Sequence, residues 1–369
     1  MDHQQAYSRK NTWMDGKRSI LEAAVVAKNG LANERPAAPL SITDRHPRIH
    51  MRPSAISDLT VTVVIPTYNR GDYLLDTIRQ VLAQDQRPDE LIVVDQTSDY
   101  DATTESQLQQ WHKQGSICRI RHSPPGLAQA RNRAIQESNS DILIFVDDDI
   151  VLSPGFIQAH RDAYEDPDVL IVAGQILGES RPLHSGDVDD YELNFPLSHD
   201  IQAWVKNMGG GNFSVYRRLA LEIGGFDQRF YQTAYCEESD FLFRFCRQYN
   251  CLARFEPTAS LVHLAAQSGG CEAREKVSAP FSISYSVCDF YFSLRNLAPH
   301  RALARVVCRA VSRTASRYGQ STARRVWLFP LRAMCECIAF GLAFVRIIRG
   351  RELMSTDKHS VGPSDVNAP

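Results

Sequence analysis

Three adjacent carboxylates, Asp147, Asp148 and Asp149, directly follow the apolar run 142–146. Like charges at neighbouring positions repel one another, so the arrangement is costly unless a cation offsets it. In an extended segment the side chains of residues 147 and 149 point to one side and that of residue 148 to the other. Two carboxylates on one side suit Mg²⁺ or Mn²⁺ shared with a diphosphate. The alternative is a solvated acidic turn, because Asp is common in loops.

A second acidic group is formed by Glu237, Glu238 and Asp240. Clustered carboxylates raise the pKa of at least one member, which suits a general base that works near neutral pH. The alternative is an acidic start to a helix over 239–249, which the helix dipole favours. Between the two groups, three glycines at 209–211 let the backbone approach a bulky ligand closely, although a plain flexible turn has the same composition.

These residues need a scaffold, and strands alternate with helices along residues 61–146. Short β-branched runs typical of buried parallel strands are separated by stretches with helical spacing of apolar residues. The expected strands are 61–65, 91–94, 117–121 and 142–146, and the expected helices are 72–84, 103–113 and 126–137. The alternation predicts a mostly parallel sheet, and in such sheets ligands bind at the carboxyl ends of the strands. Three strands end there on polar residues, namely Thr67-Tyr68-Asn69, Asp95 and Asp147–Asp149.

Several ordered motifs resemble those of glycosyltransferase family 2, which has the GT-A fold. The resemblance covers about residues 60–300 and is carried by the VVIPTYNR stretch that ends at Arg70, VVDQTS at 93–98, GLAQARN at 126–132, DDD at 147–149, the segment 209–226 and EESD at 237–240. It implies an α/β GT-A fold with a mostly parallel central sheet flanked by helices, a Rossmann-like nucleotide-binding half and a helical C-terminal extension.

The resemblance also implies roles for individual residues. The donor nucleotide would be bound by Pro66, Thr67, Tyr68, Asn69, Asp95, Arg131, Asp147 and Asp148. Asp95 would accept a hydrogen bond from the base, and Arg131 near a helix N-terminus would hold diphosphate oxygens. A strand-end cap is the alternative for Asp95, and an ordinary salt bridge is the alternative for Arg131.

The same resemblance assigns the remaining site residues. Asp147, Asp149 and His263 would hold the metal, and Gly210, Gly211 and Asn212 would face the acceptor. Glu238 falls on the position of the catalytic base, with Asp240 ranked second and Glu237 beside it. The family usually has Asp at the base position, and Gln96 stands where a second Asp is common. For His263 a purely structural role is the alternative.

The activity expected from these assignments is inverting transfer of a sugar from a nucleotide-diphosphate sugar to a hydroxyl acceptor, with Mg²⁺ or Mn²⁺. The acceptor would be a glycan or a lipid-linked sugar in polysaccharide or glycolipid assembly. No Q-x-x-R-W motif follows the base region, which favours single additions over processive synthesis. The alternatives are a sugar-phosphate nucleotidyltransferase, whose glycine-rich loop the Pro66–Gly71 turn does not resemble, and a non-catalytic scaffold of the same fold.

Composition limits the class of protein further. A formal net charge of −2 argues against a nucleic-acid partner. Nine scattered cysteines without a CxxC pair, and no apolar leader at the N-terminus, favour the cytoplasm. No uncharged apolar run reaches 18 residues, so an ordinary membrane-spanning helix is not expected. Composition leaves the oligomeric state open.

Three regions are expected along the chain: a flexible arm at 1–58, the catalytic domain at 59–295, and a basic helical extension at 296–369. In the extension an arginine recurs at every fourth position from Arg301 to Arg317, and a mostly apolar stretch follows at 326–348. This pattern favours helices lying in a membrane interface through 296–350, with arginines facing anionic headgroups at the inner face of the membrane. The alternative is a solvated basic helix followed by a helix packed on the catalytic domain.

Overall fold

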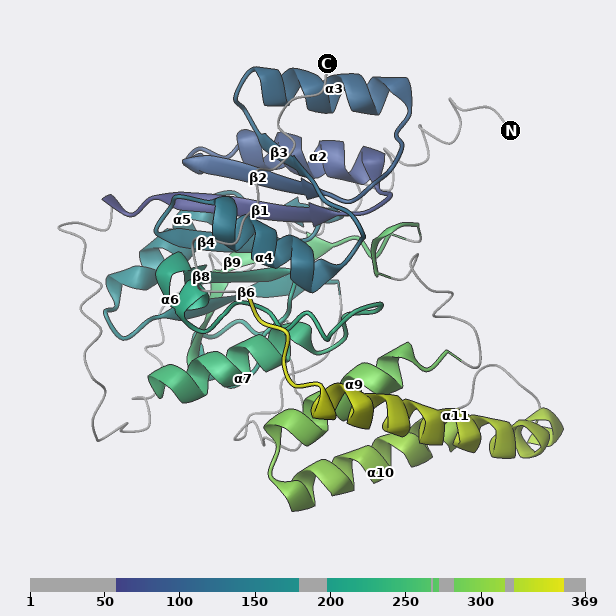
Figure 1. Ribbon diagram of the computed structural model, residues 1–369. Coiled ribbons are helices and arrows are strands. Elements are labelled where there is room, and N and C mark those ends of the chain that lie inside the picture. The colour runs from purple at the N-terminus through teal and green to yellow at the C-terminus, as the bar shows by residue number, and fades with distance from the viewer. Residues whose placement is uncertain (1–57, 179–197, 267, 272–281, 316–321, 355–369) are drawn as a thin grey trace.

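The computed structural model describes residues 58–178, 198–266, 268–271, 282–315 and 322–354. The arm expected at 1–58 lies outside these ranges except for Asp58, and so does the end of the C-terminal extension. Figure 1 shows a central sheet covered by helices and, below it, a separate layer of three helices.

The N-terminal half of the sheet is parallel, as the sequence predicts. Its strands pair in the order β3-β2-β1-β4, and all seven residues of β1 are buried. The helix α2 turns Leu74, Ile78 and Val81 toward the core, and Asp101 caps α3 by accepting from the N–H groups of Thr103 and Thr104. The elements of this half are β1 (Val61–Thr67), α2 (Gly71–Leu82), β2 (Glu90–Asp95), α3 (Ala102–Lys113), β3 (Cys118–Arg121), α4 (Leu127–Glu137) and β4 (Ile142–Val146).

Beyond β4 the sheet is mixed rather than parallel. The strand β8 is antiparallel to β4 and to β6, and β9 is antiparallel to β5 and β7 but parallel to β6. The sequence expectation of a mostly parallel sheet therefore holds only for the first half. The place beside β4 is taken by β8, a strand distant in the sequence, and no local pattern predicts the direction of such a pairing.

The elements of this second half are β5 (Ile150–Leu152), α5 (Phe156–Asp162), the 3₁₀ turn η2 (Ala163–Glu165), β6 (Ile171–Leu177), β7 (Ala203–Val205), β8 (Asn212–Tyr216), α6 (Arg217–Glu222), α7 (Glu237–Tyr249) and β9 (Ala253–His263).

The three-helix layer consists of α9 (Ser284–Asn296), α10 (Pro299–Ala315) and α11 (Thr322–Ile348). It packs around a second hydrophobic core, in which Phe290 and Phe292 of α9 meet Val306 of α10 and Ala343 of α11, together with Phe230 and Cys236 from the segment before α7. A division at residue 296 would cut α9 away from the two helices it packs against. The helical layer therefore begins at Ser284, twelve residues before the expected boundary at 296.

After α11 the chain returns to the sheet domain. The N–H of Met354 donates to the carbonyl of Gly224 (2.9 Å), and the N–H of Gln228 donates to the carbonyl of Glu352 (2.9 Å). The N–H of Glu352 also donates to Asp227 (2.9 Å). We call residues 350–354 the return segment; it fastens the helical layer to the loops beside α7.

Among the described residues, one helical stretch, Leu328–Ile348, has the length and apolar composition needed to cross a membrane. This stretch contains no uncharged apolar run of 18 residues, because Arg332, Glu336 and Arg346 interrupt it, so the expectation that no helix could span a membrane is not met here.

Candidate functional site

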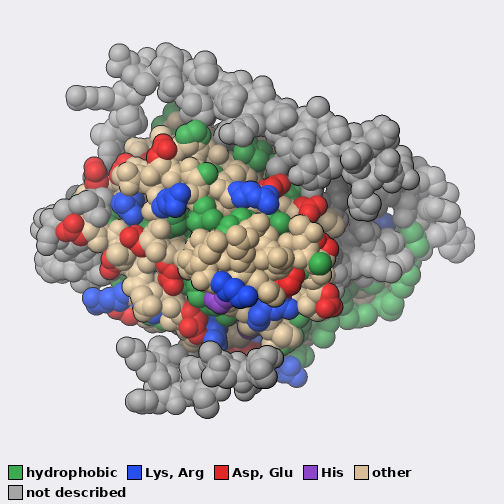
Figure 2. Space-filling view, turned by 90° about the horizontal axis from the view of Figure 1, so that it is seen from above, with side chains coloured by type: hydrophobic (Ala, Val, Ile, Leu, Met, Phe, Trp, Pro, Cys, Tyr) green, Lys and Arg blue, Asp and Glu red, His purple; other side chains and the backbone are tan. Residues whose placement is uncertain are grey.

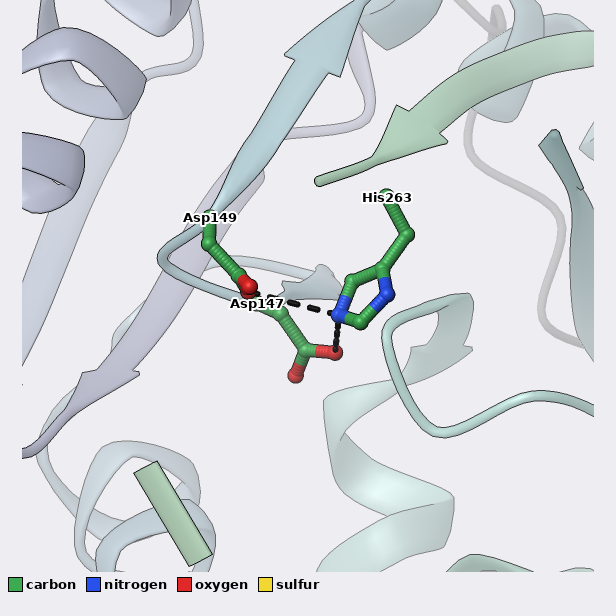
Figure 3. Close-up of side chains that lie close together, drawn as sticks. All are labelled: Asp147, Asp149 and His263. Atoms are coloured by element: carbon green, nitrogen blue, oxygen red, sulfur yellow. Dashed lines mark ion pairs between the residues drawn. The ribbon is translucent and has the colours of Figure 1, made fainter. Parts of the chain in front are cut away.

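Asp147, Asp149 and His263 lie together at the carboxyl end of the sheet (Figure 3). The Nε2 atom of His263 is 3.3 Å from Oδ1 of Asp149 and 3.7 Å from Oδ2 of Asp147. One ligand atom from each residue lies within 4.8 Å of the others, which is compatible with a shared cation. The pairing of β5 with β9 explains the meeting, because Ile150 lies opposite His263 in that ladder. The structure thus brings together the three residues predicted as metal ligands.

Asp149 is the most firmly held of the three. Its Oδ2 accepts from the N–H of Ala266 (2.7 Å), and its Oδ1 faces a guanidinium nitrogen of Arg70 at 2.6 Å. Burial acts to raise the pKa of Asp149, but contacts with His263, Arg70 and the Ala266 N–H hold that pKa below its ordinary value. Asp149 is therefore anionic at neutral pH, as a metal ligand must be.

Asp148 points the other way, as extended geometry predicts. Its carboxylate accepts from the Thr67 hydroxyl (2.7 Å) and from Arg70 (3.1 Å), and it is buried. Burial raises its pKa to about 7, although Arg70 acts in the opposite direction. Asp148 joins the acidic turn to the end of β1, and it does not reach the Asp147–Asp149–His263 cluster.

Arg70 is a member of the site for which the sequence analysis proposed no role. Besides its two aspartates, its Nε donates to the carbonyl of Ser268 (2.9 Å). The glycines that follow Ser268 lie close against it: a Cβ on Gly269 would come within 2.4 Å of Cγ of Arg70, and one on Gly270 within 2.7 Å of its guanidinium. Arg70 is the final residue of the VVIPTYNR stretch, so the motif could have drawn attention to it. The sequence could not show which groups its long side chain contacts.

The end of β1 and the following turn, Pro66–Asn69, line the same edge of the sheet. Pro66 and Thr67 are buried in β1, the carbonyl of Tyr68 accepts from the N–H of Gly270 (2.7 Å), and Asn69 adopts a positive φ of 55°. The turn is therefore fastened to the loop that carries Gly270, next to the acidic cluster.

Asp95, predicted to read a nucleobase, is fully buried and has several donors of its own. One carboxylate oxygen accepts from the Thr97 N–H (2.9 Å) and the Tyr100 hydroxyl (3.0 Å). The other faces Arg119 (2.7 Å) and Arg121 (2.9 Å). A base could bond to Asp95 only by displacing one of these donors, so its nucleotide-binding role stays a prediction.

Arg131 and Glu237 form a buried ion pair. Arg131 also donates to the carbonyl of Gly210 (2.6 Å) and lies against the rings of Phe213 and Phe226. A fully buried pair of this kind is positioned to hold the glycine loop and the start of α7 together. Both side chains are almost wholly buried, and the predicted roles of Arg131 in donor binding and of Glu237 in catalysis stay predictions.

The glycine loop runs between Asp147 and Glu238. A Cβ on Gly211 would lie 2.3 Å from Oδ2 of Asp147, and one on Gly210 would lie 3.4 Å from Cγ of Glu238. Gly211 is therefore required by its close approach to the Asp147 carboxylate, whereas the tightest contact of a Cβ on Gly210 would be with the guanidinium of Arg131 (3.2 Å). Asn212, predicted to face the acceptor, instead points into the sheet, where it donates to the carbonyls of Gln175 and Ala259 and pairs with His160.

Replacing Gly211 by alanine is expected to displace Asp147, because the new methyl group cannot fit beside its carboxylate. We expect affinity for Mn²⁺ to fall by roughly 10- to 100-fold, the range found when the support of a metal ligand is lost. Titration of free Mn²⁺ by electron paramagnetic resonance measures this. The matched control is Gly341→Ala in α11, where a Cβ meets nothing within 4 Å. Unchanged Mn²⁺ affinity in Gly211→Ala would contradict the packing argument.

Glu238 lies half-buried in the first turn of α7, beside the glycine loop. Burial raises the pKa of Glu238 to about 7; Arg131 lowers it and Asp147 raises it. A carboxylate that changes its protonation state near neutral pH and is not wholly buried has the properties of a general base.

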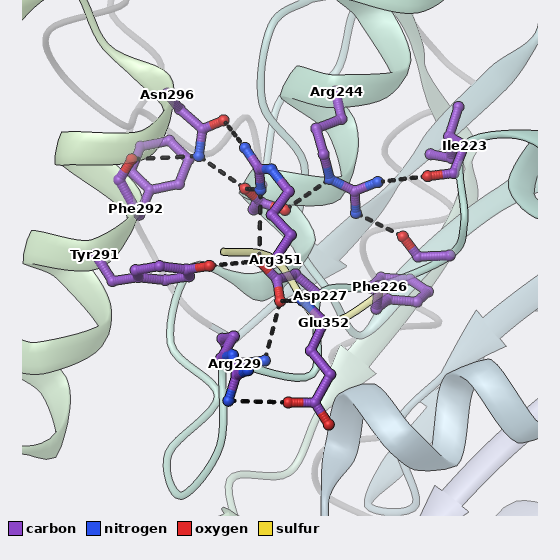
Figure 4. Close-up of polar contacts among 12 residues, drawn as sticks. Ile223, Phe226, Asp227, Arg229, Arg244, Tyr291, Phe292, Asn296, Arg351 and Glu352 are labelled. Carbon is purple, nitrogen blue, oxygen red and sulfur yellow. Dashed lines mark hydrogen bonds and ion pairs between the residues drawn. The ribbon is translucent and has the colours of Figure 1, made fainter. Parts of the chain in front are cut away.

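Asp240, the second candidate base, is fully buried, and three side chains labelled in Figure 4, those of Arg244, Asn296 and Arg351, converge on it. Its carboxylate accepts from Arg244 (2.8 Å), Asn296 (2.8 Å) and Arg351. These partners come from α7, α9 and the return segment. Burial acts to raise the pKa of Asp240, but the two arginines and Asn296 bring it below its ordinary value.

Replacing Asp240 by asparagine is expected to lower the free energy of unfolding by about 3–5 kcal/mol, because it leaves buried arginines without their anion. Since the folded pKa is depressed, the contribution of Asp240 is present above the unfolded pKa of about 4 and is lost as pH falls. The difference between wild type and Asp240→Asn, measured by urea unfolding, should therefore shrink from pH 7 toward pH 3. The control Asp76→Asn removes an exposed pair with Arg79 and should cost less than about 1 kcal/mol. A fold as stable as wild type, with activity lost, would favour Asp240 as a base instead.

The sheet has a parallel first half, an acidic turn after its last parallel strand and a histidine facing that turn, which is the arrangement expected of a GT-A fold. Residues 62–224 match the family model described as glycosyl transferase family 2.

Two curated relatives each match a little less than half of the chain. A glucosyl-dolichyl phosphate glucuronosyltransferase of Haloferax volcanii is 26% identical over 182 residues, which cover 46% of this chain and 56% of that protein. A hyaluronan synthase of Streptococcus pyogenes is 27% identical over 176 residues, covering 44% of this chain and 42% of the synthase. The chain thus spans about half the length of these relatives.

Two solved structures are similar in fold. A mannosyltransferase from Pyrobaculum calidifontis in complex with GDP-Man and Mn²⁺ superposes with a TM-score of 0.46 at 17% identity, over 89% of this chain and 98% of that one. GalNAc-T7 with UDP, GalNAc and Mn²⁺ has a TM-score of 0.48 at 17% identity, over 79% of this chain and 57% of that one.

Proposed function

We propose that this protein transfers a sugar from a nucleotide-diphosphate sugar to a hydroxyl acceptor, with inversion at the anomeric carbon and with Mg²⁺ or Mn²⁺. The observation that carries the proposal is the position of the Asp147–Asp149–His263 cluster, which only the glycine loop separates from Glu238. The match of residues 62–224 to the glycosyl transferase family 2 model supports it. The cluster fits a hard divalent cation, because two carboxylates and one imidazole nitrogen lie close enough to share it.

In this proposal Asp147, Asp149 and His263 would hold the cation, and the cation would supply positive charge to offset that of the departing nucleoside diphosphate. Glu238 takes the proton from the acceptor hydroxyl as that oxygen forms its bond to the anomeric carbon. The bond from that carbon to the diphosphate oxygen breaks in the same step, and the diphosphate leaves with the electron pair. A single base suffices for such a direct displacement, which is why inversion is expected.

The turn Pro66–Asn69 and Asp95 would border the nucleotide, and the backbone of Gly210 and Gly211 would face the acceptor. Arg70, Arg131 and Glu237 would act indirectly by holding the acidic turn and the glycine loop in place. The acceptor in this proposal is a glycan or lipid-linked sugar, met on the cytoplasmic side of a membrane that residues 296–350 contact. The relative from Haloferax volcanii, named for action on glucosyl-dolichyl phosphate, supports a lipid-linked acceptor.

A panel of nucleotide sugars tested with Mn²⁺ or Mg²⁺ decides the proposal. Binding is measured by isothermal titration calorimetry, and turnover by release of nucleoside diphosphate. We expect one donor class to bind only with metal and to be hydrolysed slowly without acceptor. Failure of every donor to bind with metal present would overturn the proposal. Release of pyrophosphate from a nucleoside triphosphate and a sugar 1-phosphate would establish a nucleotidyltransferase instead.

A further inference from the structure

In helices α10 and α11 the distribution of buried and exposed side chains is the reverse of that expected for a helix exposed to water. On a solvated helix the apolar face packs inward and the charged face is exposed. Here arginines are buried, and large apolar side chains cover the outside. Figure 1 shows the two helices side by side at the edge of the molecule, and Figure 2 shows hydrophobic side chains gathered on the same side.

Along α10, two of the regularly spaced arginines point into the protein. Arg305 is only 3% exposed, and both Arg305 and Arg313 pair with the buried carboxylate of Asp289 on α9 at 2.9 Å. Leu303 and Val311 on the outer face are each 61% exposed. The expectation that these arginines face anionic headgroups is therefore wrong for Arg305, because Asp289 provides an internal anion that the stripe alone could not reveal.

Along α11 the same reversal extends over Leu328–Ile348. Arg332 and Arg346 are each 5% exposed, and Arg346 lies over the ring of Tyr231 (3.7 Å). The third charged residue, Glu336, accepts from the Ser286 hydroxyl of α9 (2.8 Å). The outer positions carry large apolar side chains. Those with at least 39% exposure are Phe329, Leu331, Met334, Ile338, Phe340, Leu342, Phe344, Val345 and Ile348.

The dimensions of this surface match a lipid bilayer better than a protein partner. Twenty-one helical residues extend about 30 Å, the thickness of the hydrocarbon layer. A protein interface has an apolar centre and a polar rim, whereas here the exposed positions of the stretch carry no charged side chain along its whole length. In the sequence Arg324 and Arg325 precede the stretch and Arg349 follows it, so arginines bound it at both ends, where headgroups would lie.

We propose that the outer face of the α10–α11 pair inserts into the hydrocarbon layer of a membrane, with Arg305 and Arg313 of α10 and Arg332 and Arg346 of α11 turned into the protein. This deepens the membrane contact included in the proposed function: apolar side chains make the contact, and these four arginines do not. Ionisable side chains turned toward a protein interior and apolar ones turned outward are the arrangement that hydrocarbon demands.

Cys337 offers a natural reporter, because it is exposed on α11 within the apolar face. The full-length protein is reconstituted into vesicles of phosphatidylcholine and phosphatidylglycerol by detergent removal, and treated with a membrane-impermeant maleimide. Mass spectrometry reads labelling at each cysteine. We expect vesicles to reduce labelling of Cys337 at least tenfold. A thiol introduced on the sheet domain by Ile201→Cys, at a position 54% exposed, should label equally with and without vesicles.

Three results would overturn the proposal. Protection of Cys337 without vesicles that grows with protein concentration would show that a second copy covers the face. Protection without vesicles at every concentration would show that another part of the chain covers it. Release of the protein from vesicles by 1 M NaCl would show an electrostatic contact without insertion.

The variant Ile338→Arg/Phe344→Arg places charges on the apolar face, and its matched control is Ile201→Arg. We expect the double variant to lose co-flotation with vesicles and the control to keep it. Donor hydrolysis, measured in the same samples, reports whether the catalytic domain is folded and active. Lost flotation with hydrolysis retained supports insertion. Retained flotation overturns insertion without affecting the proposed function, and absence of hydrolysis in wild type counts only against the function.

Discussion

The Glu238→Gln variant is expected to lose about 10³-fold in kcat, within the range that general-base catalysis contributes. Glutamine keeps the shape of the side chain but cannot take the proton from the acceptor hydroxyl. KM for the donor and affinity for Mn²⁺ should stay within about threefold of wild type, since Glu238 lies across the glycine loop from the acidic cluster. Steady-state kinetics with a donor and acceptor pair measure the split between kcat and KM.

The pH profile provides a second measurement on the same residue. Burial raises the pKa of Glu238 to about 7, and a base is active only when deprotonated. The rate constant kcat/KM should therefore rise with pH up to about 7 and level off above it, and this limb should disappear in Glu238→Gln. The control Glu137→Gln removes an exposed carboxylate paired with Arg133 and should leave the profile unchanged. A variant at position 238 with full activity and an unaltered profile would exclude Glu238 as the base.

The Asp149→Asn variant is expected to weaken Mn²⁺ binding by at least about 10²-fold, since a neutral amide replaces the buried anion that faces His263. Transfer should fall by a comparable factor at limiting metal, because the cation contributes several kcal/mol to stabilising the leaving group. Electron paramagnetic resonance of free Mn²⁺ reports binding independently of turnover.

Asp148→Asn is the matched control for this prediction. Its carboxylate faces Thr67 and Arg70 on the far side of the turn, so its loss should change Mn²⁺ affinity only a few-fold. If the two asparagine variants bind Mn²⁺ equally, the assignment of Asp149 to the metal and of Asp148 to a buried structural contact is wrong.

The parallel half of the fold could be predicted because its signals are local. A run such as Val61–Ile65 specifies a buried strand by itself, and the spacing of Leu74, Ile78 and Val81 specifies the helix that covers it. The antiparallel half depends on pairings between distant segments, such as β5 with β9, for which no local pattern exists. The sequence therefore predicted the edge of the sheet that holds the site more accurately than the rest of the sheet.

For the site, residue type identified the acidic turn and His263, but it could not show which way a carboxylate faces. Asp95 and Asp240 have the same chemistry as Asp149 or Glu238, yet arginines from elsewhere in the chain engage both. The roles of Arg70 and Asp289 could not be predicted for the same reason. Their ion-pair partners lie on other helices and loops, and only the three-dimensional structure brings them together.

The return segment has a consequence for how the protein is made. Asp240 and Arg351 are 111 residues apart in the chain, and Asp227 also receives its contacts with Arg351 and Glu352 from the return segment. At about 5–20 residues per second, a ribosome adds Arg351 roughly 5–20 s after Asp240. The helices α10 and α11 are synthesised during that interval. The helix that carries Glu238 therefore gains its salt bridge to Arg351 only after α9, α10 and α11 have been synthesised.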